Sequence, residues 1–100
     1  MRNQASPTTA APASRPAIHY RVDGAGPALT LVHGVGARLE SWDEVVPFLA
    51  PRFRVVRLDL RGHGRSDPIE GACTLDDFVD DVRHVWDRLG IAKTHWITAL

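Results

Sequence analysis

The sequence predicts an α/β fold in which a mostly parallel sheet is flanked by helices. Segments typical of strands and helices alternate along the 100 residues, in the order strand, strand, helix, strand, helix, strand. This order favours crossover connections, in which a helix returns the chain to the next parallel strand. Two polar loops with two glycines each, residues 33–40 and 61–68, follow a strand directly, at the end where parallel sheets form their sites.

The first 16 residues predict a disordered tail, and residues 17–100 predict the folded domain. The tail is rich in Ala, Pro, Ser and Thr and has no aromatic or branched aliphatic residue, so it cannot bury enough apolar surface to become ordered. It also lacks the continuous apolar stretch of a signal peptide. A transit peptide is the alternative, because the segment carries Arg and Ser but no acidic residue.

Two strands are expected next. Ile18, Tyr20 and Val22 alternate with polar residues, as in a half-exposed strand. The turn-forming stretch 23–27 then leads to residues 29–32, a short apolar run that is typical of a strand buried on both faces.

A helix is expected after the first glycine-rich loop. Ser41 with Glu44 three positions later matches a capping box, and the apolar residues that follow share one helical face. Pro47 conflicts with a long helix, because it lacks the amide donor and crowds the preceding turn. The helix is therefore predicted to be short, to be kinked, or to begin later than Ser41.

The second half of the chain predicts a strand over 53–60, a long helix, and a final strand over 94–100. Thr74 is the expected N-cap of the helix and Gly90 its end. Between them the apolar residues recur at helical spacing and form one continuous stripe, which consists of Leu75, Phe78, Val79, Val82, Val85, Trp86 and Leu89.

Composition argues against several function classes. The 12 Lys and Arg residues balance the 12 Asp and Glu residues, so no net charge favours nucleic acid or an anionic membrane. No apolar run reaches the roughly 18 residues of a membrane span. Cys73 is the only cysteine, which rules out an internal disulfide and fits a reducing compartment. We expect a cytoplasmic protein with no nucleic-acid or membrane partner, and the sequence does not predict its oligomeric state.

The first loop (residues 33–40) and the second loop (residues 61–68) only partly match phosphate-binding patterns. Neither contains a Walker sequence, and each has Gly-x-Gly without the third glycine of a dinucleotide-binding loop. His33 and His63, with Asp59 nearby, carry side chains that bind metals. Their spacing does not place ligands on one face, so hydrogen bonding to the backbone is the favoured role. No metal or other cofactor is predicted.

An oxyanion hole is the remaining interpretation of the first loop. Acyl-transfer reactions develop negative charge on a carbonyl oxygen, and preorganised backbone N–H groups stabilise that charge. Glycines directly after a buried strand allow the backbone to turn an amide into a site without a steric penalty.

Residues 29–67 resemble the N-terminal half of the α/β-hydrolase core. That family has a strand ending in H-G-x, then a Trp and a helix, and then a strand ending in D-x-R-G-x-G-x-S. The matching stretches here are 33–35, Trp42 and 59–66. The following helix and strand also match in order and length, so the resemblance covers about 18–100.

Within the family, the resemblance is compatible with an enol-lactonase-like or a carboxylesterase-like parent. The sequence HGVG lacks the proline often found after H-G-x in epoxide hydrolases and haloalkane dehalogenases, which disfavours those two groups. The resemblance implies that Val35 contributes one oxyanion N–H through its backbone, with no role for its side chain. It implies structural roles in the loops for His33, Gly34, Gly36, Asp59, Arg61, Gly62, His63 and Gly64.

The resemblance also implies an incomplete core that stops before the nucleophile. In the family the nucleophile follows the strand corresponding to 94–100, and the acid and the catalytic His come later. The chain alone is therefore expected to be inactive, while its parent would hydrolyse a small-molecule ester, lactone or C–C bond next to a carbonyl. The alternative is a non-enzymatic chain that binds another molecule or has no function. The nucleophile, whether Ser, Asp or Cys, stays open.

Overall fold

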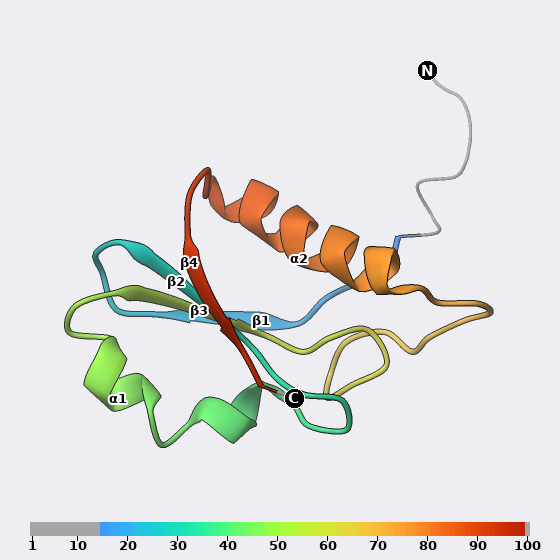
Figure 1. Cartoon of the computed structure of the whole chain (residues 1–100), viewed down its shortest axis with the longest axis horizontal. Helices are drawn as coiled ribbons and strands as arrows, with labels where there is room; N and C mark the ends of the chain where they lie inside the picture. Colours follow the sequence, from blue (N-terminus) through green and yellow to red (C-terminus); the bar gives the residue numbers. More distant parts are fainter. Residues whose placement is uncertain (1–14, 100) are drawn as a thin grey trace.

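The computed structural model describes residues 15–99, which form one four-stranded sheet with helices on both faces (Figure 1). The predicted α/β class is confirmed. Most of the predicted N-terminal tail, residues 1–14, lies outside the described residues.

The sheet has the spatial order β1 (Tyr20–Asp23), β3 (Arg54–Leu58), β2 (Ala28–Val32) and β4 (His95–Thr98). Strand β2 pairs in parallel with both β3 and β4, whereas β1 runs antiparallel to β3. The sheet is therefore mostly parallel, as predicted, and the carboxyl ends of β2, β3 and β4 lie at one edge.

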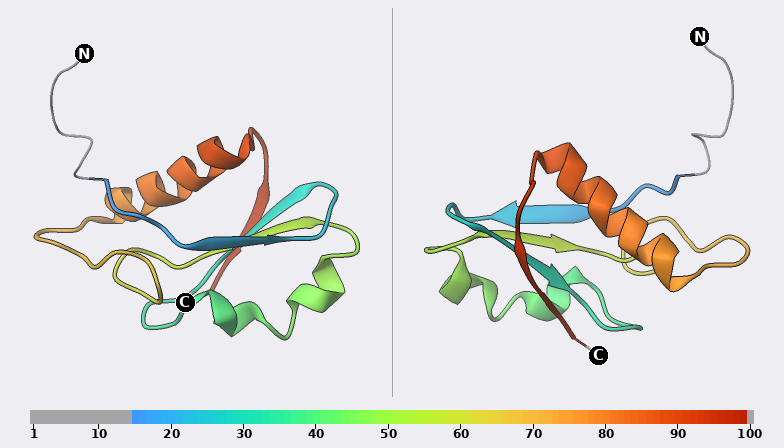
Figure 2. Two further views of the ribbon diagram at one scale, coloured as in Figure 1. Left: turned by 180° about the vertical axis from the view of Figure 1, so that it is seen from behind. Right: turned by 45° about the horizontal axis from the view of Figure 1, so that its top comes forward.

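Two apolar clusters fill the spaces above and below the sheet, because successive side chains of a strand point to opposite faces. On one face, Leu29 and Leu31 pack with Val55 and Val46. The other face carries a larger cluster against the long helix, formed by Val32, Val56, Leu58, Leu60, Val82 and Val85. Figure 2 shows the helices on opposite sides of the strands.

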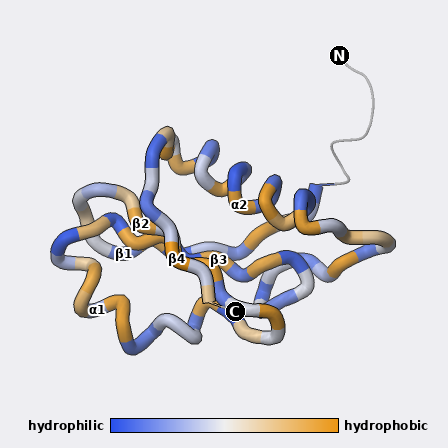
Figure 3. Tube along the Cα trace, in the orientation of Figure 1, coloured by the Kyte–Doolittle hydropathy of each residue, from blue (hydrophilic) through white to orange (hydrophobic). Residues whose placement is uncertain are grey.

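Helix α2 (Leu75–Leu89) covers the second of these faces and begins and ends where the sequence predicts. The Thr74 hydroxyl accepts from the Asp77 N–H at 3.3 Å, and the Asp77 carboxylate accepts from the Thr74 N–H at 2.8 Å. The hydrogen bond from Thr74 lowers the pKa of Asp77. Apolar and polar residues alternate along the helix (Figure 3), although Leu75 at the start of the predicted stripe is 78% exposed.

The segment after the first loop differs from the predicted capping box. A 3₁₀ turn, η2 (Leu39–Trp42), is followed by the short helix α1 (Val46–Leu49), with Pro47 in its first turn. Ser41 lies inside the 3₁₀ turn, where its hydroxyl accepts from the Arg38 N–H at 3.4 Å, so it does not cap α1. Proline is tolerated only in the first helical turn, and this fixes the later start.

Arg57 is a charged residue at a buried position in the middle of β3. Its guanidinium bonds to Asp43 at 2.6 Å, to the Leu39 carbonyl at 3.2 Å and to Asp23 at 3.3 Å. Buried charges are tolerated when they are paired in this way. Arg57 therefore ties η2 and the end of β1 to the sheet.

Strand β4 lies at the sheet edge, and all four of its residues are exposed. It is connected to α2 through side chains: Trp86 donates from Nε1 to the Thr30 hydroxyl at 2.9 Å, and its ring meets Trp96 edge to face at 5.8 Å. Within residues 15–99, no helix is long and apolar enough to cross a membrane.

Candidate functional site

The first and second loops leave the adjacent parallel strands β2 and β3 at the same edge of the sheet, so the topology brings them together. Their two histidines are the point of contact, with ring centroids 4.9 Å apart. The carboxyl end of β4 reaches the same edge, where the Ala99 N–H donates to the Val32 carbonyl at 3.0 Å (Figure 1).

His33 is buried and connects the first loop to the second. Its Nε2 accepts from the Leu60 N–H at 2.9 Å, so the ring proton is on Nδ1, which donates to the Gly34 carbonyl at 2.7 Å. Burial lowers the pKa of His33 below its ordinary value, against the opposing effect of the Gly34 carbonyl. The geometry therefore requires a neutral imidazole, and the burial favours one.

His63 makes the reciprocal connection. Its Nε2 accepts from the Gly36 N–H at 2.9 Å, and its Nδ1–H donates to the Arg61 carbonyl at 3.0 Å. Each histidine therefore accepts a hydrogen bond from an amide that follows the neighbouring strand: His33 from Leu60 after β3, and His63 from Gly36 after β2. Each ring uses both nitrogens, which leaves no free lone pair for a metal. Residues 15–99 contain no group of three or more side chains that could hold one.

Val35 sits at the tip of the first loop and is 92% exposed. The Ala37 N–H donates to the Gly34 carbonyl at 3.0 Å, which closes a four-residue turn with Val35 and Gly36 at its centre. Within the described part of the chain, the Val35 N–H has no hydrogen-bond acceptor. This amide is thus available to a ligand, while the next two amides are already bonded.

Asp59 holds the second loop against η2. Its buried carboxylate accepts from the Leu39 N–H at 2.7 Å and from the Arg65 N–H at 3.0 Å. Gly64 lies directly over this carboxylate, and a Cβ atom there would overlap it. Bonds of this kind, from amides to an ionised carboxylate, are among the stronger hydrogen bonds in proteins.

Arg61 anchors the second loop to helix α2 through Asp81. Two parallel bonds, of 2.9 and 2.8 Å, join the guanidinium to this carboxylate. The pair raises the pKa of Arg61. Asp81 is 1% exposed and was not identified from the sequence, although one signal was present: it falls three residues after Phe78 and four before Val85, on the apolar side of the helix.

Ser66 is a second contact that the sequence did not reveal. Its hydroxyl donates to the Asp59 carbonyl at 2.6 Å and accepts from the His19 N–H at 2.8 Å. The Gly62 N–H donates to the Asp67 carbonyl at 2.8 Å, which closes the second loop on itself. All the predicted site residues therefore lie in one cluster, and Val35, at the tip of the first loop, is an exposed residue whose amide has no acceptor in the described residues.

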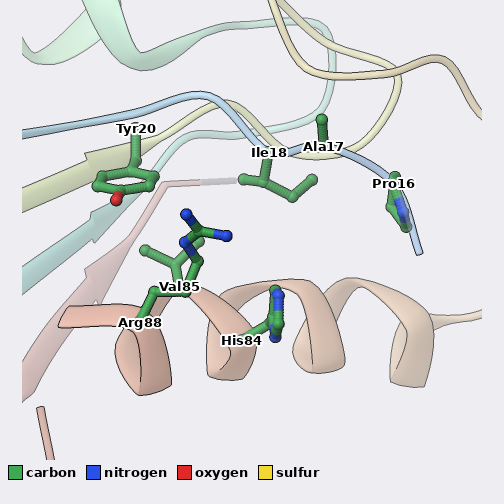
Figure 4. A pocket seen from close by; sticks show the side chains of 7 residues that line it. All are labelled: Pro16, Ala17, Ile18, Tyr20, His84, Val85 and Arg88. Atoms are coloured by element: carbon green, nitrogen blue, oxygen red, sulfur yellow. The ribbon is translucent and has the colours of Figure 1, made fainter. Parts of the chain in front are cut away.

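A separate groove of about 240 Å³ lies between the chain before β1 and helix α2 (Figure 4). Its lining includes Tyr20, His84 and Arg88, and none of its residues belongs to either loop. The groove is therefore not part of the candidate site.

Comparison with known proteins agrees with this arrangement. Residues 27–98 match a family model described as the alpha/beta hydrolase fold. The chain is 39% identical over 62 residues to an (E)-2-((N-methylformamido)methylene)succinate hydrolase of Acinetobacter baylyi, in a match that covers 62% of this chain and 24% of the relative. It is 37% identical over 85 residues to a fluoroacetate dehalogenase of a Burkholderia species, covering 80% of this chain and 28% of the relative.

Two solved structures show the same fold. A hydrolase from Pseudomonas aeruginosa PA01 superimposes with a TM-score of 0.78 at 38% identity, covering 81% of this chain and 31% of that one. The enol-lactonase of Burkholderia xenovorans LB400 gives 0.78 at 35% identity, covering 81% and 33%. The matches span only 24% and 28% of the length of these two curated relatives.

Proposed function

Because this chain belongs to the alpha/beta hydrolase fold family, we propose that it forms the oxyanion-hole side of a hydrolase active site. In this proposal the Val35 N–H stabilises the negative charge on a substrate carbonyl oxygen. The observation that carries it is that Val35 is an exposed residue whose amide has no acceptor in the described residues, on a loop at the carboxyl edge of a parallel sheet. Amides placed there stabilise developing charge without reorganisation.

The nucleophile, the acid and the catalytic His would be supplied by residues beyond these 100. Strand β4 ends beside β2, so a residue that follows β4 would emerge next to the first loop. His33 and His63 are not candidates for the catalytic base, because both ring nitrogens of each are bonded to the backbone.

We propose a small-molecule substrate whose reacting bond is an ester, a lactone, or a C–C bond next to a carbonyl. Each of these develops an oxyanion during hydrolysis, which is what a backbone donor serves. The similarity to an enol-lactonase and to a succinate-derivative hydrolase supports this class. The main alternative reaction is dehalogenation, because one Burkholderia relative is named as a fluoroacetate dehalogenase.

The test is a pair of substitutions at Val35 in a complete protein that contains this chain. Val35→Pro deletes the amide, so kcat toward a simple activated ester should fall by roughly 10²–10³. Val35→Ala keeps the amide and should leave kcat nearly unchanged. Circular dichroism must show that the proline variant is folded, because proline also restricts φ. Equal, small losses in both variants would place the donor elsewhere.

A further inference from the structure

The groove between the chain before β1 and helix α2 has the features of a separate binding site. Its volume is about 240 Å³, below the roughly 300–1,000 Å³ of sites for drug-sized ligands, so it suits a molecule of only a few heavy atoms. No residue of the first or second loop lines it. A ligand in the groove would therefore leave the Val35 amide free.

Three side chains that carry hydrogen-bond donors line the groove from two elements. His84 and Arg88 lie four residues apart on one face of α2, and Tyr20 comes from β1. Figure 4 shows the Arg88 guanidinium reaching from the helix toward Tyr20. Within residues 15–99, none of these three side chains has a hydrogen-bond or ion-pair partner, so their donors are available to a ligand.

The remaining walls of the groove are apolar and partly fixed in place. Pro16, Ile18 and Val85 contribute apolar side chains. Ala17 is held by two hydrogen bonds to Asp67: its N–H donates to the carboxylate at 2.8 Å, and its carbonyl accepts from the Asp67 N–H at 2.9 Å. No carboxylate is among the described residues that line the groove. The groove thus combines one permanent positive charge with two neutral donors and an apolar surface.

We propose that this groove binds a small carboxylate that carries a short apolar tail. The Arg88 guanidinium matches the carboxylate, because its planar fork donates two parallel hydrogen bonds. The Tyr20 hydroxyl and the N–H that His84 carries in either tautomer supply further donors. Phosphate matches less well, because it carries more charge than one arginine balances and has no apolar part for the walls. This inference does not depend on the proposed function of the first loop.

A neighbouring hollow on α2 lacks this preference for an anion. It shares His84 with the groove, but its two arginines are balanced by two aspartates, and these four residues are Arg15, Arg83, Asp80 and Asp87. The Arg83 guanidinium lies 3.8 Å from the Asp80 carboxylate, which offsets its charge. Arg83 and Arg88 lie on the same helix and both are exposed, so Arg83 provides a matched control for Arg88.

The experiment titrates butyrate, and separately its neutral analogue butyramide, into the complete protein. The methyl groups of Ile18 and Val85 are followed by NMR, because shifts at these two residues distinguish the groove from a site at the two loops. Butyrate should shift both signals saturably, with a Kd on the order of 1 mM for its six heavy atoms. Butyramide should bind about 10-fold more weakly or less, because it lacks the charge that pairs with Arg88.

Two substitutions then identify the recognising side chain. Arg88→Gln should weaken butyrate binding about 10-fold or more, whereas Arg83→Gln should change the Kd by less than about twofold. The proposal is overturned by the absence of saturable shifts, by equal affinity for butyrate and butyramide, or by a larger loss in Arg83→Gln than in Arg88→Gln. Each of these results leaves the proposed function standing, because that function is tested by kcat of the Val35 variants.

Discussion

Two loops leave neighbouring parallel strands at one edge of the sheet, and they differ in what anchors them. The second loop is fixed by side chains with charge, through Asp59 to two amides and through Arg61 to the buried Asp81. In the described part of the chain, the glycine-containing half of the first loop, residues 33–37, is held only by a turn bond and the histidine contacts, and its tip is exposed.

The difference shows how rigidity and access are divided at this edge. A loop that must present an amide to another molecule cannot bury that amide in its own bonds, so its rigidity has to come from a neighbour. The second loop supplies it, because its Asp59 carboxylate also holds η2 and its His63 contacts the turn. We therefore expect changes in the second loop to cost more stability than equivalent changes in the first.

The largest effect is expected for Gly64→Ala. The new Cβ would overlap the Asp59 carboxylate, which cannot move without losing its bonds to two amides, and φ of 50° adds backbone strain. The free energy of unfolding should fall by about 4 kcal/mol, because two hydrogen bonds to a carboxylate are lost and backbone strain is added. Urea unfolding followed by tryptophan fluorescence measures it. A loss below about 1 kcal/mol would mean that Asp59 does not brace the loop.

The second largest loss of stability is expected for Asp81→Ala. It removes both bonds of Arg61 and leaves a guanidinium that is 16% exposed, so water compensates part of the loss. We expect about 2 kcal/mol, below the range for a fully buried pair. Asp80→Ala, on the exposed face one residue away, is the control and should change stability by less than about 0.5 kcal/mol. Equal effects at the two positions would contradict the anchoring role of Asp81.

Gly36→Ala is the matched change in the first loop. No atom lies within 4 Å of the added Cβ, so only the positive φ of 87° opposes the substitution. The expected cost is about 1 kcal/mol. The same urea measurement serves here. A cost equal to that of Gly64→Ala would remove the contrast between the two loops.

The smallest effect is expected from acid. Burial lowers the pKa of His33 in the folded state, so the unfolded chain takes up a proton first as pH falls below the ordinary value of about 6.5. Stability from this group is therefore complete above that pH and declines below it, by less than about 1.4 kcal/mol per pH unit. The contribution of His33 is found by measuring the free energy of unfolding between pH 7 and 5.5 in the wild type and in His33→Gln. Identical slopes would show that His33 does not contribute.

Local signals in the sequence predicted the parts of the fold that depend on near neighbours. Helix α2 begins after Thr74 and ends before Gly90 as expected, because its caps and its stripe are all within one segment. Ser41 does not cap α1, and the helix is short and begins later, which is one of the outcomes expected from Pro47. The strand over 53–60 proved shorter, as the ladder with β2 ends at Leu58.

The sequence alone did not predict which side chains of distant segments contact one another. The clustering of the two glycine loops follows from adjacent parallel strands, and it was expected. The bond between His63 and Gly36, and that between Arg61 and Asp81, depend on the register of the sheet and on the rotation of α2. Arg57 had no visible partner either, because Asp23 and Asp43 approach it only once β1 and η2 are in place.

The edge-to-face pair of Trp86 and Trp96 has a consequence for the kinetics of folding. The pair joins α2 to β4, and β4 pairs with β2 across almost the whole domain in sequence. Contacts of such long separation require the largest loop closure, so β4 should dock last. Two indoles at this distance couple their electronic transitions. The near-ultraviolet circular dichroism of the pair should therefore appear only when β4 docks, and its time course measures the rate of that final step.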